Sequence, residues 1–262
     1  MGLSSLKVVI LCGGLGTRIR GVDDDVPKPM IRIGGEPILV HIMRYYASWG
    51  HRDFILCLGY KGDVIRSYFT DRGSVVRRDG DDLVVNVDID DTGRSDRTWT
   101  VTLAETGTAT MTGGRVAKVR KHVDGESFML TYGDGVTDVN IDELIASHER
   151  RDRAMTLTAV RPPSRFGEVR YGADGVATSF NEKPQTSEGR ISGGYFVCRP
   201  KVFDYLADRE DLVFEVEPMK GMVRDGQLSV YEHDGFWQCM DTHRDWELLG
   251  DLDRRNEAPW KR

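Results

Sequence analysis

The chain has 262 residues, an apolar content of 39% and a formal net charge of −6. This length favours one α/β domain with an insertion or a modest C-terminal extension. The negative charge, with a sequence pI near 5.6, argues against a nucleic-acid surface, which needs clustered Lys and Arg. We also expect no membrane partner, because the sequence contains neither a signal peptide nor an apolar run of bilayer length.

Cysteine usage indicates a reducing compartment. Cys12, Cys57, Cys198 and Cys239 lie far apart, each within a short apolar segment. Their spacing fits neither a zinc site nor a disulfide framework. We therefore expect buried thiols and a cytoplasmic protein.

The first part of the chain predicts repeated strand-then-helix units. Strands are expected at Lys7–Leu11 and Asp53–Leu58, and helices over Pro37–Trp49 and Val64–Phe69. Strands that alternate with helices imply parallel pairing through right-handed crossovers. Residues 72–98 break this order and predict an exposed hairpin or flap.

The same order resumes after residue 98. We expect strands at 100–104, 128–131, 154–160, 191–197, 228–232 and 236–240, a hairpin over 166–182 turned at Asp174-Gly175, and helices at 114–123, 141–151, 201–206, 217–224 and 244–254. Without a repeat or linker, residues 1–262 are expected to form one α/β domain with a C-terminal elaboration from about residue 200.

A glycine-rich segment, Leu11–Arg18, follows the first strand. Its glycines allow close backbone approach, and its N–H groups can bind an anion. A dinucleotide fingerprint would need a third glycine at Ile19, and a Walker loop would need Lys where Thr17 stands. Arg18 and the proline-flanked Lys28 favour a polyphosphate ligand, although a simple strand–helix turn with exposed cations is the alternative.

Two carboxylates follow predicted strands. Asp134 lies between glycines just past the strand at 128–131, where open α/β sheets bind ligands. Mg²⁺ favours one or two carboxylates together with phosphate oxygens, and Asp241 is the candidate for the second. The alternatives are a turn stabilised by Asp134 and a helix capped by Asp241.

Further candidates suit an acceptor substrate. Glu182 and Lys183 are adjacent after a predicted strand, which fits a sugar phosphate or a surface ion pair. Gly193 and Gly194 allow close approach to a ligand or mark a bulge.

Together these motifs resemble the sugar nucleotidylyltransferases: GGLGTR at 13–18, PKPM at 27–30 and EKP at 182–184. A narrower likeness is to the glucose-1-phosphate cytidylyltransferases within that family, on IGGEPI at 33–38, MTGGR at 111–115, TYGDG at 131–135, RFG at 165–167, GFWQ at 235–238, MDT at 240–242 and APWK at 258–261.

The resemblance implies a Rossmann-like mixed α/β fold with a mostly parallel sheet flanked by helices. It implies Mg²⁺-dependent transfer of a cytidylyl group from CTP to glucose 1-phosphate, giving CDP-glucose and pyrophosphate. It further implies a homo-oligomer, specifically a hexamer.

The resemblance also assigns roles by position. The nucleotide would contact Leu11, Gly13, Gly14, Gly16, Thr17, Arg18, Lys28, Thr110, Arg115 and Gly133. Asp134 and Asp241 would bind the metal, and Glu182, Lys183 and Gly194 would bind the sugar phosphate. Arg18, Lys28, Asp134 and Lys183 would carry the catalysis.

Two segments depart from the family pattern, residues 20–26 and 71–97, and could alter nucleotide discrimination and subunit contacts. The same reaction with dTTP or UTP remains an alternative. So does a non-catalytic paralogue that binds a nucleotide sugar, and a nicotinamide dehydrogenase is a third reading.

Overall fold

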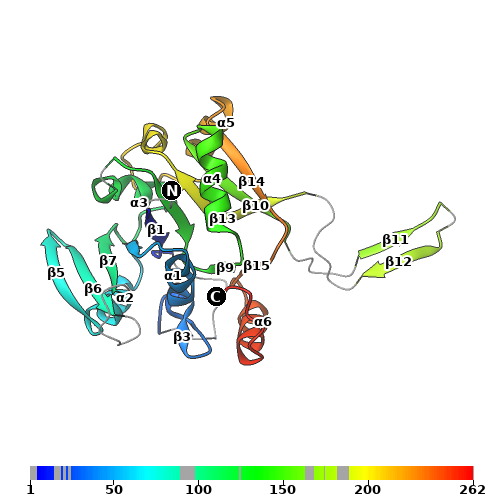
Figure 1. Ribbon diagram of the computed structural model, residues 1–262, viewed down its shortest axis with the longest axis horizontal. Coiled ribbons are helices and arrows are strands. Elements are labelled where there is room, and N and C mark those ends of the chain that lie inside the picture. Colours follow the sequence, from blue (N-terminus) through cyan, green and yellow to red (C-terminus); the bar gives the residue numbers. More distant parts are fainter. Residues whose placement is uncertain are drawn as a thin grey trace.

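A computed structural model describes residues 5–14, 19, 22, 25–88, 98–123, 125–162, 168–173, 175–181 and 189–261. Its centre is a nine-stranded sheet in the order β14-β10-β13-β8-β1-β4-β7-β6-β5 (Figure 1). These strands are β1 (Lys7–Leu11), β4 (Asp53–Leu58), β5 (Gly73–Asp79), β6 (Asp82–Asp88), β7 (Thr98–Glu105), β8 (Phe128–Tyr132), β10 (Met155–Val160), β13 (Ile191–Cys198) and β14 (Leu228–His233).

The sheet is mixed and mostly parallel, as expected. Strands β13 and β6 pair antiparallel with their neighbours, and the other seven of the nine run in one direction. The central trio β8-β1-β4 is parallel, so their carboxyl ends open on one edge of the sheet. In doubly wound sheets this edge is where ligands bind.

Helices cover both faces of the sheet. They are α1 (Ile38–Ser48), α2 (Gly62–Thr70), α3 (Thr112–Lys118), α4 (Ile141–Arg151), α5 (Glu217–Arg224) and α6 (His243–Arg254), with short 3-10 helices η2 (Lys28–Met30), η4 (Arg120–His122) and η5 (Pro200–Tyr205). One core cluster includes side chains of α1, α2 and α4, and the cluster on the opposite face includes those of α3, η5 and α5.

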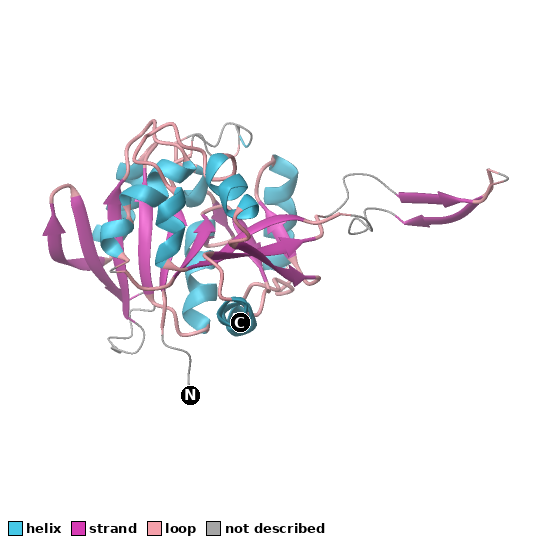
Figure 2. Cartoon of the chain, turned by 90° about the horizontal axis from the view of Figure 1, so that it is seen from above, coloured by secondary structure: helices cyan, strands magenta, loops and turns pink. Residues whose placement is uncertain are grey.

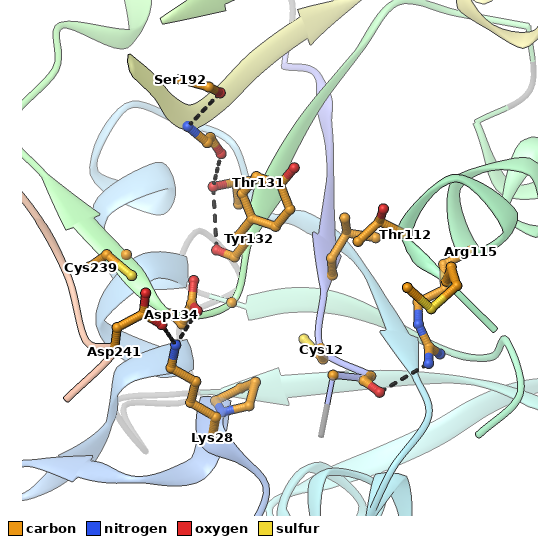
Figure 3. Close-up of a pocket in the computed structure, with 18 of the residues that line it drawn as sticks. Cys12, Lys28, Thr112, Arg115, Thr131, Tyr132, Asp134, Ser192, Cys239 and Asp241 are labelled. Carbon is orange, nitrogen blue, oxygen red and sulfur yellow. Dashed lines mark hydrogen bonds and ion pairs between the residues drawn. The ribbon is translucent and has the colours of Figure 1, made fainter. Parts of the chain in front are cut away.

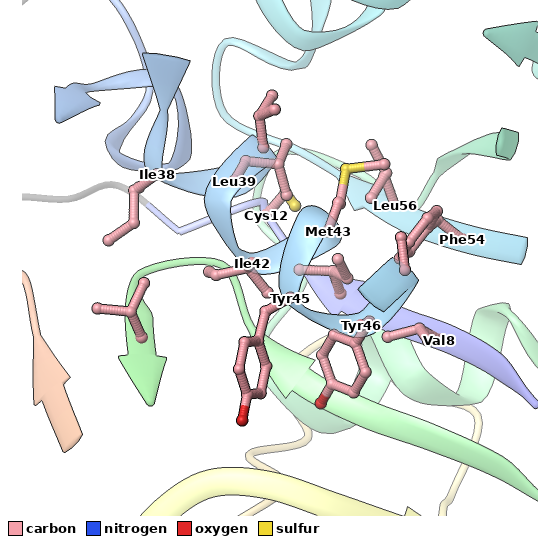
Figure 4. Close-up of a cluster of buried hydrophobic side chains, with 14 of the residues drawn as sticks. Val8, Cys12, Ile38, Leu39, Ile42, Met43, Tyr45, Tyr46, Phe54 and Leu56 are labelled. Carbon is pink, nitrogen blue, oxygen red and sulfur yellow. The ribbon is translucent and has the colours of Figure 1, made fainter. Parts of the chain in front are cut away.

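Alternation along the central strands separates these two cores. In β1, Val8 and Ile10 belong to the first cluster, whereas Val9 and Leu11 belong to the second. All four residues are buried, as continuous apolar runs of parallel strands require. Figure 4 shows the apolar face of α1 over this surface, with Tyr46 near Val8.

Three small sheets complete the fold: β2 (Arg32–Ile33) with β3 (Glu36–Pro37), β9 (Gly135–Thr137) with β15 (Trp237–Cys239), and β11 (Glu168–Tyr171) with β12 (Ala177–Asn181). The last pair is the hairpin expected within 166–182, and it lies apart from the main sheet (Figure 2). Among the described helices, none has the length and apolarity that crossing a bilayer demands.

The C-terminal segment packs back onto the body of the protein. Trp260 is buried, stacks on Phe236 and donates its indole N–H to His41 Nδ1 at 3.3 Å. Trp246 of α6 donates to the Arg32 carbonyl at 2.8 Å. These contacts fix α6 beside β2, and therefore fix the chain that follows Asp241.

Candidate active site

A cavity of about 680 Å³ opens at the carboxyl ends of β1 and β8. Its walls come from distant parts of the chain, namely residues 11–14, 28–29, 108–112, 115, 131–135, 192–195, 237, 239 and 241. Residues 11–14 of the glycine-rich segment, Lys28 and both candidate metal ligands therefore meet in one place.

The two aspartates are brought together by a short strand pair. Asp134 directly precedes β9, Asp241 lies two residues after β15, and these strands pair antiparallel with Cys239 opposite Gly135. A further backbone hydrogen bond, 2.8 Å from the Met240 N–H to the Asp134 carbonyl, continues this pairing. The carboxylates consequently face each other although 107 positions (241 − 134) separate them in sequence.

Lys28 occupies the space between these carboxylates (Figure 3). Its ammonium lies 2.5 Å from Asp134 Oδ2 and also donates to Asp241 Oδ1. The turn of η2, closed by a 2.7 Å bond from the Met30 N–H to the Pro27 carbonyl, fixes the backbone that carries it. Burial, the largest single influence, would lower the pKa of Lys28, but the charge of Asp134, Cys239 nearby and the hydrogen bonds to Asp134 and Asp241 together outweigh it, so the pKa rises and the side chain stays charged.

The chemistry of this cluster fits a hard divalent cation. One ligand atom each of Asp134, Cys239 and Asp241 lies within 4.8 Å of the others. Burial and then the charge of Asp134 raise the pKa of the Cys239 thiol, so it remains protonated. Two carboxylate oxygens suit Mg²⁺, whereas a neutral thiol does not.

The capping alternative for Asp241 is wrong. Helix α6 is capped by Thr242, whose side chain accepts from the Asp245 N–H. Asp241 lies one residue before the cap, and its carboxylate points to Lys28 in the cavity.

Arg115 is buried in the cavity wall against Gly13. Its guanidinium donates to the Leu58 carbonyl at 2.8 Å, the Thr106 hydroxyl at 2.7 Å and the Gly13 carbonyl at 2.9 Å. A Cβ on Gly13 or on Gly59 would overlap this guanidinium. Arg115 therefore ties the ends of β1, β4 and β7 together, a role that the sequence did not suggest.

The N-terminus of α3 is closed by a segment from the C-terminal third of the chain. The N–H groups of Gly113 and Gly114 donate to the Leu212 carbonyl, and that of Met111 to the Glu210 carbonyl. A Cβ on either glycine would contact backbone atoms of this segment at less than 3.0 Å. The two glycines of MTGGR therefore allow the backbone at 209–212 to pack directly against the start of α3.

The same segment reaches the cavity rim through Glu215. Its carboxylate accepts from the Tyr132 hydroxyl and, at 2.8 Å, from the Thr112 hydroxyl. No sequence signal indicates this contact, because Glu215 lies in an irregular stretch far from both partners along the chain.

On the opposite wall, β13 supplies Gly194 with φ +75°, a left-handed conformation that favours glycine. A Cβ there would collide with the Tyr132 ring. The Gly194 carbonyl accepts from the Thr131 hydroxyl at 2.8 Å, and the neighbouring Gly193 carbonyl accepts from Trp237 Nε1 at 2.7 Å. Trp237 also lines the cavity.

The predicted site residues divide into two groups. Those that line this cavity are Leu11, Gly13, Gly14, Lys28, Thr110, Arg115, Gly133, Asp134, Gly194 and Asp241. Those outside the described residues are Gly16, Thr17, Arg18, Glu182 and Lys183.

Comparison with known proteins gives the family. The sequence model described as "Nucleotidyl transferase" matches residues 7–252. The chain belongs to the nucleotidyl transferase family. Within it, the chain is 44% identical to the glucose-1-phosphate cytidylyltransferase of Salmonella typhimurium, over 98% of this chain and 99% of that protein. It is 41% identical, with the same coverage of each chain, to a Bacillus subtilis protein named "Probable glucose-1-phosphate cytidylyltransferase".

A solved structure shares the architecture. The crystal structure of HddC from Yersinia pseudotuberculosis matches with a TM-score of 0.67 at 24% identity, over 95% of this chain and 99% of that one. At this identity the likeness concerns the fold, and it confirms the mixed sheet with flanking helices expected from the sequence.

Proposed function

We propose that this nucleotidyl transferase transfers a cytidylyl group from CTP to glucose 1-phosphate, giving CDP-glucose and pyrophosphate. The observation that carries the proposal is the meeting of Asp134, Asp241 and Lys28 in one cavity. The choice of CTP and glucose 1-phosphate follows the relatives that are 41% and 44% identical over 98% of the chain.

Mg²⁺ is the proposed cation, held by carboxylate oxygens of Asp134 and Asp241. When bound, it would neutralise phosphate charge and act as a Lewis acid toward the α-phosphoryl group. Cys239 is not proposed as a ligand, because Mg²⁺ prefers oxygen to sulfur.

In the proposed reaction an oxygen of the sugar phosphate attacks the α-phosphorus of CTP in line. The bond from this phosphorus to the bridging oxygen breaks, and pyrophosphate leaves with the electron pair. The attacking phosphate is already anionic, so no strong base is needed. The protein's task is to hold two mutually repelling anions in line and to stabilise the charge on the leaving group.

Cationic side chains perform that task in this proposal. The Lys28 ammonium, positioned at the carboxylates, contacts oxygens of the triphosphate together with Arg18. Lys183 orients the attacking phosphate, and Glu182 and the Gly194 backbone bind sugar hydroxyls. The remaining nucleotide contacts are proposed for Leu11, Gly13, Gly14, Gly16, Thr17, Thr110, Arg115 and Gly133.

We propose that residues 1–262 act as one catalytic domain, because the cavity draws its walls from residues 11 to 241. The β5–β6 pair belongs to the insertion at 72–98, and the C-terminal elaboration begins near residue 200.

The proposed assembly is a homo-oligomer, a hexamer by resemblance. A two-stranded hairpin such as β11–β12 is marginally stable alone, which supports packing against another copy. Free cysteines support a cytoplasmic location.

The test is pyrophosphate release from the purified protein with Mg²⁺, glucose 1-phosphate and one nucleoside triphosphate at a time. Release with CTP far above that with UTP, dTTP or GTP is the expected result. Preferred release with another triphosphate would overturn the cytidine assignment. If no pyrophosphate is released with any of the four triphosphates, nor with a panel of other sugar 1-phosphates, a non-catalytic nucleotide-sugar-binding protein would be favoured.

A further inference from the structure

We propose that Asp245 is a positioning residue that holds Asp241 in place to bind the divalent cation. Asp245 lies on the first turn of α6, outside the cavity lining, and rests half-buried behind Asp241. The inference rests on the proposed function, since it assumes that Asp241 is a metal ligand.

One oxygen of the Asp245 carboxylate fixes the backbone around Asp241. Oδ2 accepts from the Asp241 N–H at 3.1 Å, the Thr242 N–H at 2.8 Å and the Thr242 hydroxyl at 2.8 Å. In an ordinary capping box this side chain accepts only from the backbone N–H of the cap residue. The additional bond to the Asp241 N–H extends the restraint to the residue that faces Asp134.

The other oxygen reaches the strand before Asp241. Oδ1 accepts from Gln238 Nε2 at 3.0 Å, and Gln238 is a buried residue of β15. Since β15 pairs with β9, which follows Asp134 directly, this bond joins Asp245 to the element that positions the first ligand. The Asp245 carboxylate therefore bridges the chain on both sides of Asp241.

Such a restraint matters because the two candidate ligands repel each other. Apart from the Lys28 ammonium between them, Asp134 and Asp241 are like charges whose ligand atoms lie within 4.8 Å of each other. If the backbone around Asp241 were not held in place, this repulsion would move Asp241 away from Asp134 and lower the affinity for the cation. Groups that orient metal ligands from behind typically contribute about 10–100-fold to metal affinity.

The experiment measures Mn²⁺ binding by electron paramagnetic resonance, with CTP present and the sugar phosphate omitted, so that no turnover occurs. Asp245→Ala should weaken Mn²⁺ binding by at least about tenfold. Asp245→Asn keeps one acceptor for the cap but turns an amide N–H₂ toward Gln238, and should weaken binding severalfold without loss of fold. Excess Mg²⁺ should restore much of the turnover of both variants.

The matched control is Asn140→Ala, which removes the cap of α4, where the Asn140 side chain accepts from the Glu143 N–H at 3.1 Å. It should lower thermal stability and leave Mn²⁺ affinity unchanged. Mn²⁺ affinity within twofold of wild type in folded Asp245→Asn would overturn the inference. If wild-type protein binds Mn²⁺ yet releases no pyrophosphate with any triphosphate, the proposed reaction fails while the Mn²⁺ comparison still decides the role of Asp245.

Discussion

Replacing Arg115 by Met should destabilise the ligand-free protein. The change removes donors to the Leu58 and Gly13 carbonyls and to the Thr106 hydroxyl. Each carbonyl keeps one backbone partner, the N–H of Thr106 or of Tyr60. The cost is therefore about 1 kcal/mol for each lost bond, the low end for buried polar groups, and roughly 3 kcal/mol in all.

The assay is equilibrium unfolding in urea without nucleotide, supported by the thermal midpoint. A loss of roughly 3 kcal/mol corresponds to a fall of about 6–12 °C in a chain of this size. Arg115→Lys should fall between wild type and Met, because an ammonium cannot match the planar guanidinium. Arg150→Met, a change at an exposed position on α4, is the control. An unchanged ligand-free midpoint would refute the structural role of Arg115 and leave only its proposed nucleotide contact.

Three further predictions address catalysis and pH. Asp134→Asn should lower kcat at least about 100-fold while the fold stays intact, because metal charge stabilisation contributes several kcal/mol; wild-type turnover at ordinary Mg²⁺ would remove Asp134 from the metal site. Lys183→Ala should chiefly raise KM for glucose 1-phosphate in steady-state kinetics, and an unaltered KM would contradict its assignment. Burial lowers the pKa of His148 to about 4 from an ordinary 6.5. The unfolded chain then binds more protons, so stability is complete above pH 6.5 and is lost as pH falls toward 4. Urea unfolding across that range should be less pH-dependent in His148→Gln, and identical pH profiles would disprove the contribution.

Elements with an unambiguous apolar pattern could be predicted to the residue. The strand Asp53–Leu58 and the helices Ile141–Arg151 and Glu217–Arg224 match their expected bounds. The antiparallel direction of β13 was not anticipated, because alternation in one strand says nothing about which way its neighbour runs.

Helix α3 shows how distant contacts shift local structure. The sequence favoured a helix over 114–123, whereas α3 begins at Thr112 and ends at Lys118. Carbonyls of Glu210 and Leu212 accept from the N–H groups at its start, so the helix begins before its two glycines. A pattern restricted to neighbouring residues could not reveal this.

The site was predictable as a set of residues but not as an arrangement. Asp134 and Asp241 were chosen for their positions after strands. Their side chains meet because β15 pairs with β9, a strand of three residues that is too short for the hydrophobic pattern of the sequence to predict. The bridging place of Lys28 is likewise a tertiary feature. The Thr242–Asp245 spacing is a capping-box signal that was present in the sequence and could have been found.

The most direct test of the central claim is a competition experiment. The protein is incubated with Mg²⁺, glucose 1-phosphate and equal concentrations of CTP, UTP, dTTP and GTP, and the nucleotide sugars are identified by mass spectrometry. We predict CDP-glucose as the dominant product. A different nucleotide sugar as the main product, or no CDP-glucose at all, would contradict the account.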